Sequence, residues 1–451
     1  MTDWTLPSSA PKASVVDAQV AEPALRTGVS RASMAVAAFS TVVEWYDFTL
    51  YLYFATVLSR VFFGPGGASL AVTLGGFAVA YLMRPLGAAV FGHVGDRYGR
   101  TRMMLLSMGL MTGAMLATAL LPTAAAIGPA AGWLLILLRC VMGFSVGGEY
   151  TGVVAYLIEG AAPHKRGLVT SSASAASEVG GLLAAGVSAI TVSALSSLDL
   201  DRWGWRIPFL IGAALAGTVW IARSFMHESP DFERQKAAGT VPPRPLAYAL
   251  RHHRRAILRG FAISALGSIT YYVGITYVPA FLSGTGGMAE NTALWLSTGA
   301  ALVVVLVTPV VGALSDRLGR KPVLVAVCLC SGLLPVATFA LMAHASTGAA
   351  LAGAALLAAV GGAVSAVGAV ATAEQFPGEG RLSGLALGAT AATAVFGGAT
   401  PYVAHELIAR TGSPLMPGLM IAVVAVAVLP VLARMPETRP APANAQDERP
   451  A

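Results

Sequence analysis

The sequence predicts an all-α membrane protein of twelve transmembrane helices, arranged as two six-helix bundles. Its composition is the first reason, because 56% of its 451 residues are hydrophobic and 11% are charged, with a mean hydropathy of +0.70. Soluble globular proteins carry about 25% charged residues, and a soluble fold of this size exposes too much surface for so many apolar side chains. The other two reasons are apolar runs of bilayer length and an internal repeat.

The apolar runs are bounded by charges, Pro or Gly and have roughly the 20 residues that a helix needs to cross about 30 Å of hydrocarbon. In the first half they cover residues 33–60, 68–92, 103–123, 132–157, 167–193 and 205–226, and in the second half residues 256–283, 291–313, 322–343, 349–373, 382–408 and 415–434. We therefore expect two bundles, 33–226 and 256–434, joined by the polar linker 227–255 and flanked by tails 1–32 and 435–451.

Two motifs recur between the halves, which predicts that the halves share one architecture. The first is Gly92-His-Val-Gly-Asp96-Arg97-Tyr-Gly99-Arg100, which returns 220 residues later as Gly312-Ala-Leu-Ser-Asp316-Arg317-Leu-Gly319-Arg320. The second is Glu159, Pro163 and Arg166, which correspond to Glu374, Pro377 and Arg381. The first motif follows the second span of each half, and the second motif follows the fourth.

The positive charges predict the orientation of the helices. With the N-terminus in the cytoplasm, 23 of the 29 Lys and Arg residues fall in cytoplasmic segments, so both termini are expected there. The net charge of +7 then follows from topology, and a nucleic-acid partner is not expected.

The repeated loop has residues suited to joining two halves reversibly. An Asp can cap the N-terminus of a neighbouring helix, while the arginines bind carbonyls or a carboxylate. The G-x-x-x-D-R-x-G-R pattern resembles the hallmark loop of the major facilitator superfamily. The residues expected to take part in conformational gating are Gly92, Asp96, Arg97, Gly99, Arg100, Asp316, Arg317, Arg320, Glu159, Arg166, Glu374 and Arg381.

Four further segments together resemble one family within that superfamily, the metabolite:proton symporters. They are the run from Arg139 to Gly152, Glu44-Trp-Tyr-Asp-Phe48, Leu82-Met-Arg-Pro-Leu-Gly87 and Trp203-Gly-Trp-Arg-Ile-Pro-Phe209. The resemblance implies a transporter of the bacterial inner membrane that works by alternating access. It implies import of citrate, 2-oxoglutarate, shikimate and related acids, or of zwitterions such as proline and glycine betaine. It also implies proton driving without a cofactor, and we expect a functional monomer.

Charged residues inside the spans are the candidates for function, because charges in hydrocarbon are costly and usually face a cavity. Glu44 and Asp47 lie three residues apart and so share one helix face. Burial favours the protonated form of a carboxyl group, which suits a proton carrier. We therefore assign proton coupling to Asp47, Glu44 and Glu149. The alternative is a permanent ion pair with Arg84 or Arg139 that holds the first bundle together.

Substrate binding is assigned to Arg84, Arg139, Tyr46, Glu178, Tyr271 and Tyr272. Guanidinium groups bind carboxylates through paired hydrogen bonds, so two membrane arginines favour an organic acid. The tyrosines could instead surround a quaternary ammonium group through cation–π contacts, or form an interfacial belt. Glu178 has no counterpart in the family pattern. His405, with Glu406, is a further candidate for a proton path.

Other classes of protein lack support in the sequence. Cys140, Cys328 and Cys330 have neither metal-ligand nor redox spacing, and no metal site is expected. Without a phosphate-binding loop or a nucleophile–base pair, neither an ATP-driven pump nor an enzyme is expected. An exporter is less favoured, because residues 177–186 of the fifth span lack the proline typical of antiporters.

Overall fold

The computed structural model describes residues 30–64, 67–343 and 346–440. All regular secondary structure within these ranges is helical. By length and composition alone, ten helical segments of the described chain are suited to cross a membrane. The first two expected spans correspond to α1 (Arg31–Tyr53) with α2 (Ala55–Phe63), and to α3 (Gly67–Tyr98), which pack beside the others.

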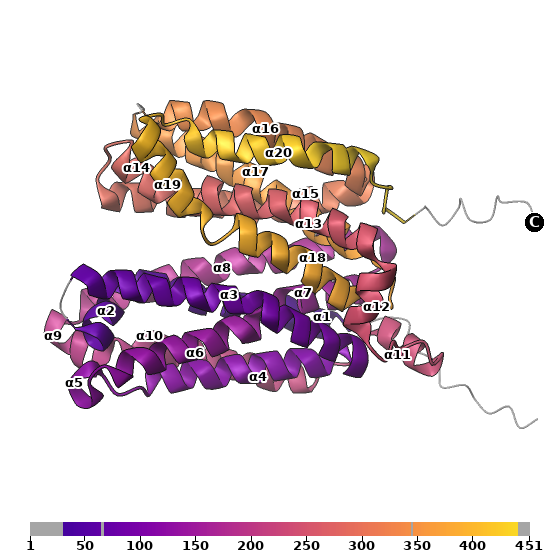
Figure 1. Ribbon diagram of the computed structural model, residues 1–451, viewed down its shortest axis with the longest axis horizontal. Coiled ribbons are helices and arrows are strands. Elements are labelled where there is room, and N and C mark those ends of the chain that lie inside the picture. The colour runs from indigo at the N-terminus through magenta and orange to yellow at the C-terminus, as the bar shows by residue number, and fades with distance from the viewer. Residues whose placement is uncertain (1–29, 65–66, 344–345, 441–451) are drawn as a thin grey trace, which may run out of the picture.

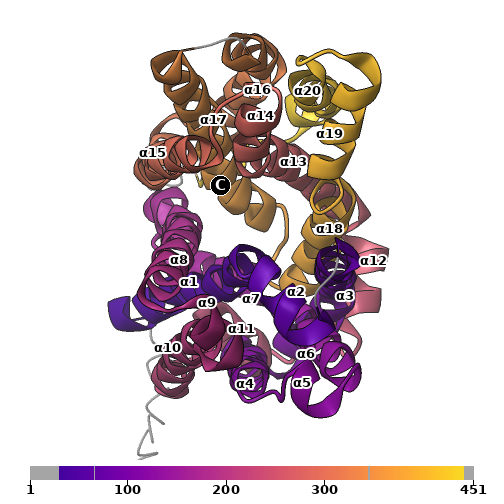
Figure 2. The ribbon, with the colours of Figure 1, turned by 90° about the vertical axis from the view of Figure 1, so that its left-hand side faces the viewer.

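The helices form two bundles, one from each half of the chain (Figures 1 and 2). The first bundle also contains α4 (Arg100–Ala119), α5 (Ala124–Ile127), α6 (Ala130–Val146), α7 (Glu149–Gly160), α8 (Arg166–Ala194), α9 (Ser197–Asp199) and α10 (Arg206–Ser224). The second contains α13 (Arg254–Tyr271), α14 (Val278–Gly284), α15 (Glu290–Leu318), α16 (Arg320–Ala343), α17 (Thr347–Glu374), α18 (Arg381–Phe396), α19 (Thr400–Thr411) and α20 (Met416–Arg434). At the boundary, α8 lies beside α15 and α3 lies beside α18.

The expected polar linker is partly helical. It contains α11 (Pro230–Ala237) and α12 (Pro245–His252), each with a proline in its first turn, where the missing N–H costs no hydrogen bond. Ser229 caps α11 by accepting a hydrogen bond from the backbone N–H of Phe232. Both helices lie across one end of the bundles, which we call the linker end (Figure 1).

Glycines set the closest helix crossing of the first bundle, between α3 and α6. A Cβ at Gly143 would overlap the carbonyl of Ala80, and one at Gly147 would overlap the carbonyl of Arg84. Small residues allow such close backbone approach between membrane helices. The α6–α7 break at Gly147 and Gly148 interrupts the fourth expected span, and the crossing brings Arg84 close to the helix that carries Arg139.

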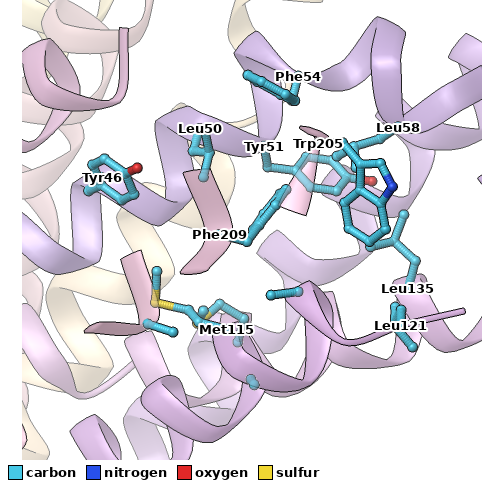
Figure 3. Packing of buried hydrophobic residues seen from close by; sticks show 14 of the residues in the cluster. Tyr46, Leu50, Tyr51, Phe54, Leu58, Met115, Leu121, Leu135, Trp205 and Phe209 are labelled. Carbon is cyan, nitrogen blue, oxygen red and sulfur yellow. The ribbon is translucent and has the colours of Figure 1, made fainter. Parts of the chain in front are cut away.

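Apolar clusters fill each bundle, and one further cluster contains buried residues of both bundles. In the first bundle, Trp205 packs edge-to-face on Phe62 and Phe209, and all three side chains are fully buried (Figure 3). Tyr46 and Tyr51 belong to the same cluster. This apolar packing fixes the rotation of α1, and with it the direction in which its charged side chains point.

Candidate functional site

At the linker end, each repeated loop binds a helix of the opposite bundle. The carboxylate of Asp96 accepts hydrogen bonds from the backbone N–H groups of Leu382 (3.2 Å) and Ser383 (2.7 Å), at the start of α18. The carboxylate of Asp316 accepts them from Gly167 (2.8 Å) and Leu168 (2.9 Å), at the start of α8. A helix N-terminus favours negative charge, so each Asp stabilises contact between the bundles.

Arginines extend these two contacts into an ion-pair network. Arg100 pairs with Asp96 at 2.9 Å and with Glu159 at 3.0 Å. By the same pattern, Arg320 pairs with Asp316 at 2.8 Å and with Glu374 at 3.0 Å. Arg381 lies 3.0 Å from Glu159 of the other bundle and 2.9 Å from Asp231 of α11. We call Asp96, Arg100, Glu159, Asp316, Arg320, Glu374 and Arg381 the linker-end network.

The remaining gating candidates lie outside the linker-end network. Gly92 lies against the backbone of Ser383, while Gly99 has a φ of +112°, which strains any other residue. The side chain of Arg97 lines a linker-end groove, and the backbone carbonyl of Arg317 accepts a hydrogen bond from Arg439. Arg166 is close to the network, but its Nε has no hydrogen-bond partner among the described residues.

Two carboxylates outside the spans, which the sequence analysis did not identify, cap equivalent helices at this end. Glu228 accepts a 2.9 Å hydrogen bond from the backbone N–H of Arg100, and Glu437 accepts a 2.8 Å bond from that of Arg320. Burial raises the pKa of Glu228. Burial also acts to raise the pKa of Glu437, but several backbone N–H groups together hold it below its usual value.

The Asp316→Asn variant is expected to open the linker end more often. A hydrogen bond to a charged group contributes about 1.5–3 kcal/mol, and roughly 1.4 kcal/mol corresponds to a tenfold shift in an equilibrium. Ser383→Cys at the distant α3–α18 contact is the reporter, because Ser383 is fully buried and its hydroxyl has no hydrogen-bond partner within the described chain. Its labelling by a water-soluble maleimide, with the native cysteines replaced, should accelerate about tenfold.

The control for this experiment is Asp201→Asn, which removes an exposed ion pair with Arg60 at the opposite end of the first bundle. In the Asp201→Asn control, the reporter cysteine at position 383 should be labelled at the same rate as in the protein that carries the reporter alone. Equal labelling of Asp316→Asn and the parent would contradict a gating role for the network.

A cavity of about 210 Å³ lies between the two bundles. Its wall is made from both halves of the chain and combines one arginine, two carboxylates, four tyrosines, a tryptophan and several hydroxyl side chains. The residues that matter for its chemistry are Glu44, Trp45, Tyr81, Arg84, Tyr150, Glu178, Tyr271 and Tyr272. A cavity between two bundles, with a mostly apolar wall and a few polar and charged groups, is suited to hold a small polar solute.

Among the residues that the structure describes, Arg84 is the only basic side chain in the wall of this cavity. It lies 3.6 Å from the carboxylate of Glu44, and its guanidinium stacks 4.6 Å from the ring centre of Phe48 and 4.8 Å from that of Tyr81. Its Nη2 has no hydrogen-bond partner among the described residues. The same Nη2 makes the 3.6 Å ion-pair contact with Glu44, so a carboxylate in the cavity would compete with Glu44 for this donor.

Aromatic side chains join the two bundles across the cavity. The hydroxyls of Tyr81 and Tyr272 share a hydrogen bond, and the rings of Trp45 and Tyr271 meet edge-to-face with centres 5.4 Å apart. The hydroxyl of Tyr271 also bonds to the carboxylate of Glu178. Trp45 and Tyr81 were missed by the sequence assignment, although Trp45 lies inside the Glu44–Phe48 motif.

Asp47 and Arg139 form a buried ion pair beside this cavity. Their closest atoms are 2.8 Å apart, and Arg139 also donates to the hydroxyl of Thr118. The pair lines a small side pocket that shares four residues with the main cavity, namely Glu44, Tyr81, Arg84 and Val146. Asp47 and Arg139 therefore lie next to the cavity without lining it.

The structure places three other candidates away from the cavity. Tyr46 is fully buried in the apolar cluster, where its hydroxyl donates to the carbonyl of Pro208 at 2.9 Å (Figure 3). Glu149 pairs with Arg223 of α10 inside the first bundle. His405 lies on the exposed surface of α19. Sequence reasoning missed Arg223, although it lies inside the expected span 205–226.

The Glu149–Arg223 ion pair joins helices within the first bundle. Both side chains are at most 1% exposed. Glu149 also accepts hydrogen bonds from Ser40 of α1 and Ser107 of α4, which connects four helices of one bundle.

No group of three or more His, Cys, Asp or Glu side chains that could hold a metal ion occurs in the described residues.

Comparisons with known proteins relate the chain to membrane transporters. The profile described as "Sugar (and other) transporter" matches residues 33–241, and the profile "Major Facilitator Superfamily" matches residues 265–451. The ectoine/proline transporter ProP of Corynebacterium glutamicum is 34% identical, over 84% of this chain and 78% of its own length. The α-ketoglutarate permease of Escherichia coli is 34% identical, over 82% of this chain and 86% of its own.

A further relative supports the family, and a solved structure supports the fold. The citrate-proton symporter of Klebsiella pneumoniae is 30% identical, over 85% of this chain and 87% of its own length. The solved structure of the proton:xylose symporter XylE superposes with a TM-score of 0.77 at 19% identity, and the match covers 90% of this chain and 96% of that one.

Proposed function

The chain belongs to the metabolite:proton symporter family of the major facilitator superfamily, and on that premise we propose that it imports a small carboxylate-bearing metabolite together with protons. It is a membrane transporter rather than an enzyme. Transport proceeds by alternating access, in which the two bundles rock about the cavity between them. The proton gradient supplies the energy, no cofactor takes part, and one chain in the bilayer suffices.

The observation that carries this proposal is a cavity in which a stacked, partly unpaired arginine adjoins a buried Asp–Arg pair. Arg84 binds the carboxylate of the substrate through its Nη2, as guanidinium groups do, and the substrate replaces the 3.6 Å contact of this atom with Glu44. Asp47 carries the proton. Protonation neutralises its carboxylate and so releases Arg139 from the 2.8 Å ion pair between them. Glu44 connects the two events, since it faces Arg84 and lines both pockets.

The substrate class follows from the charges at the cavity. The sequence favoured an organic acid because it contains two membrane arginines. Arg139 is paired with Asp47 beside the cavity, so a single arginine remains to receive anions there. One arginine suits a solute with one carboxylate, whether the rest of the solute is neutral or cationic. Among the relatives, both acid permeases and zwitterion transporters occur.

The orientation in the bacterial inner membrane follows from the positive charges, with both termini and the linker end in the cytoplasm. In that orientation, the linker-end network closes the cytoplasmic side of the cavity. Import is favoured over export because α8 lacks proline.

The test is uptake by vesicles that contain the purified protein, with an imposed pH gradient. The panel comprises radiolabelled 2-oxoglutarate, citrate, shikimate, proline and glycine betaine. At least one of these should accumulate inside, and a protonophore should reduce the internal concentration to the external one. Accumulation of solute that persists without the pH gradient would contradict proton coupling. Export of solute against its own concentration gradient would show that the protein is an exporter rather than an importer.

A further inference from the structure

We infer that Glu178, Tyr271 and Trp45 form a subsite for an ammonium group, so that the preferred solute is a zwitterion whose carboxylate binds Arg84. This inference rests on the proposed transport function and specifies its substrate. The three residues come from α8, α13 and α1, and all line the cavity.

Glu178 is a buried carboxylate without a cationic partner. Its side chain lies in the cavity wall, and the residue is 9% exposed. The tyrosine hydroxyl of Tyr271 is its hydrogen-bond partner. No Lys, Arg or His among the described residues forms an ion pair with it. A buried carboxylate without a counter-charge is costly, so a cationic group in the cavity would be strongly favoured beside it.

The surroundings of Glu178 are suited to an alkylated ammonium group rather than a metal ion. The rings of Trp45 and Tyr271 stand edge-to-face in the same wall, and the ring of Tyr272 follows 5.5 Å from that of Tyr271. Aromatic faces attract quaternary and secondary ammonium groups through cation–π contacts, most strongly where water is excluded. Among the described residues, no third His, Cys, Asp or Glu side chain gathers here with others to form a metal-binding group.

The two charged ends of the cavity are complementary to a zwitterion. Of its two carboxylates, Glu44 already faces Arg84, which leaves Glu178 as the unmatched negative charge. Arg84 offers the solute's carboxylate its Nη2, which contacts Glu44 at 3.6 Å and makes no hydrogen bond within the described chain. A dicarboxylate or tricarboxylate would place a second negative charge near Glu178, and this repulsion discriminates against it.

The subsite also couples binding to the relative position of the bundles. Glu178 belongs to the first bundle and Tyr271 to the second, and their hydrogen bond crosses the boundary. An ammonium group at this point contacts both bundles at once, as a substrate must in order to stabilise one state of an alternating-access cycle.

The experiment measures equilibrium binding to the purified protein with glycine betaine, proline, tetramethylammonium and 2-oxoglutarate as probes. Glu178→Gln should weaken glycine betaine binding by at least about tenfold, because it removes the counter-charge and leaves the shape intact. Binding of 2-oxoglutarate should stay the same or tighten. Tetramethylammonium should compete with glycine betaine in the parent protein and compete poorly in the variant.

The matched control is Glu406→Gln, which neutralises a partly exposed carboxylate on α19 that pairs with Arg410. It should bind all probes like the parent. Glu178→Asp keeps the charge and should retain more affinity for glycine betaine than Glu178→Gln does. A comparison of melting temperatures shows whether each variant is folded.

Unchanged glycine betaine affinity in folded Glu178→Gln would overturn the subsite. So would a parent protein that takes up 2-oxoglutarate with protons but binds no zwitterion, although that result would leave the proposed proton symport intact. If zwitterion uptake did not depend on the proton gradient and Glu178→Gln still weakened zwitterion binding, the proposed proton symport would be wrong and the subsite would stand. A variant that loses proton coupling at unchanged affinity would make Glu178 a proton carrier and would also overturn the subsite.

Discussion

Asp47→Asn is expected to abolish accumulation of the solute while exchange across the membrane continues. Asparagine cannot take up a proton, and it resembles the neutral form of aspartic acid. With one proton per solute, two pH units sustain roughly hundredfold accumulation, since each tenfold step requires about 1.4 kcal/mol. The steady-state ratio of internal to external solute should therefore fall to about one in reconstituted vesicles. Counterflow of labelled against unlabelled solute should persist.

Stability must be separated from coupling in this variant. Asp47 and Arg139 are 2% and 3% exposed, so Asp47→Asn leaves a buried guanidinium without its counter-charge. Removing one partner of a buried pair destabilises a protein by about 3–5 kcal/mol. The double variant Asp47→Asn/Arg139→Gln is neutral at this position and should melt at a higher temperature than Asp47→Asn alone. Accumulation by Asp47→Asn at the parent's level would exclude Asp47 as the coupling residue.

Arg84→Gln is expected to weaken binding of every carboxylate-bearing solute by roughly tenfold to a hundredfold. Each hydrogen bond to a charged group contributes about 1.5–3 kcal/mol, and the guanidinium is the only basic group that the described part of the chain places in the cavity wall. Arg84→Lys keeps the charge but loses the planar fork and the stacking on Phe48 and Tyr81, so it should recover only part of the affinity. Equilibrium binding of the solute identified in the uptake panel is the measurement.

Because Arg84 also faces Glu44, the loss of affinity in Arg84→Gln has two sources. Glu44 would be left without its 3.6 Å partner and would repel a carboxylate. The double variant Arg84→Gln/Glu44→Gln removes this repulsion while still lacking the arginine. If the double variant binds like the parent, Arg84 only neutralises Glu44, and its assignment to the substrate is wrong.

The positions of the helices could be predicted from hydrophobic runs alone. The run expected at 322–343 corresponds to α16 (Arg320–Ala343), and the run at 349–373 to α17 (Thr347–Glu374). The helix ends also followed from the repeat, because the same loop motif precedes α4 and α16. Such predictions succeed because bilayer thickness sets the length of a spanning helix, whatever its neighbours are.

Only some of the residues that line the cavity could be predicted from the sequence. Glu44, Arg84, Glu178, Tyr271 and Tyr272 do meet at one cavity. The sequence, however, suggested Tyr46 where the structure has Trp45 in the wall. Consecutive residues on a helix point about 100° apart, and nothing within one span tells which of them faces a cavity.

For this protein, the sequence by itself determined the class, the repeated motifs of the two halves and the approximate ranges of the long apolar helices. Those features depend on local composition and on matching motifs. Only the tertiary structure decided which charges meet, namely Asp47 with Arg139 and Glu149 with Arg223. The physical reason is that helix rotation is set by contacts such as the Gly143–Ala80 crossing and the Trp205 cluster, which join residues far apart in the chain.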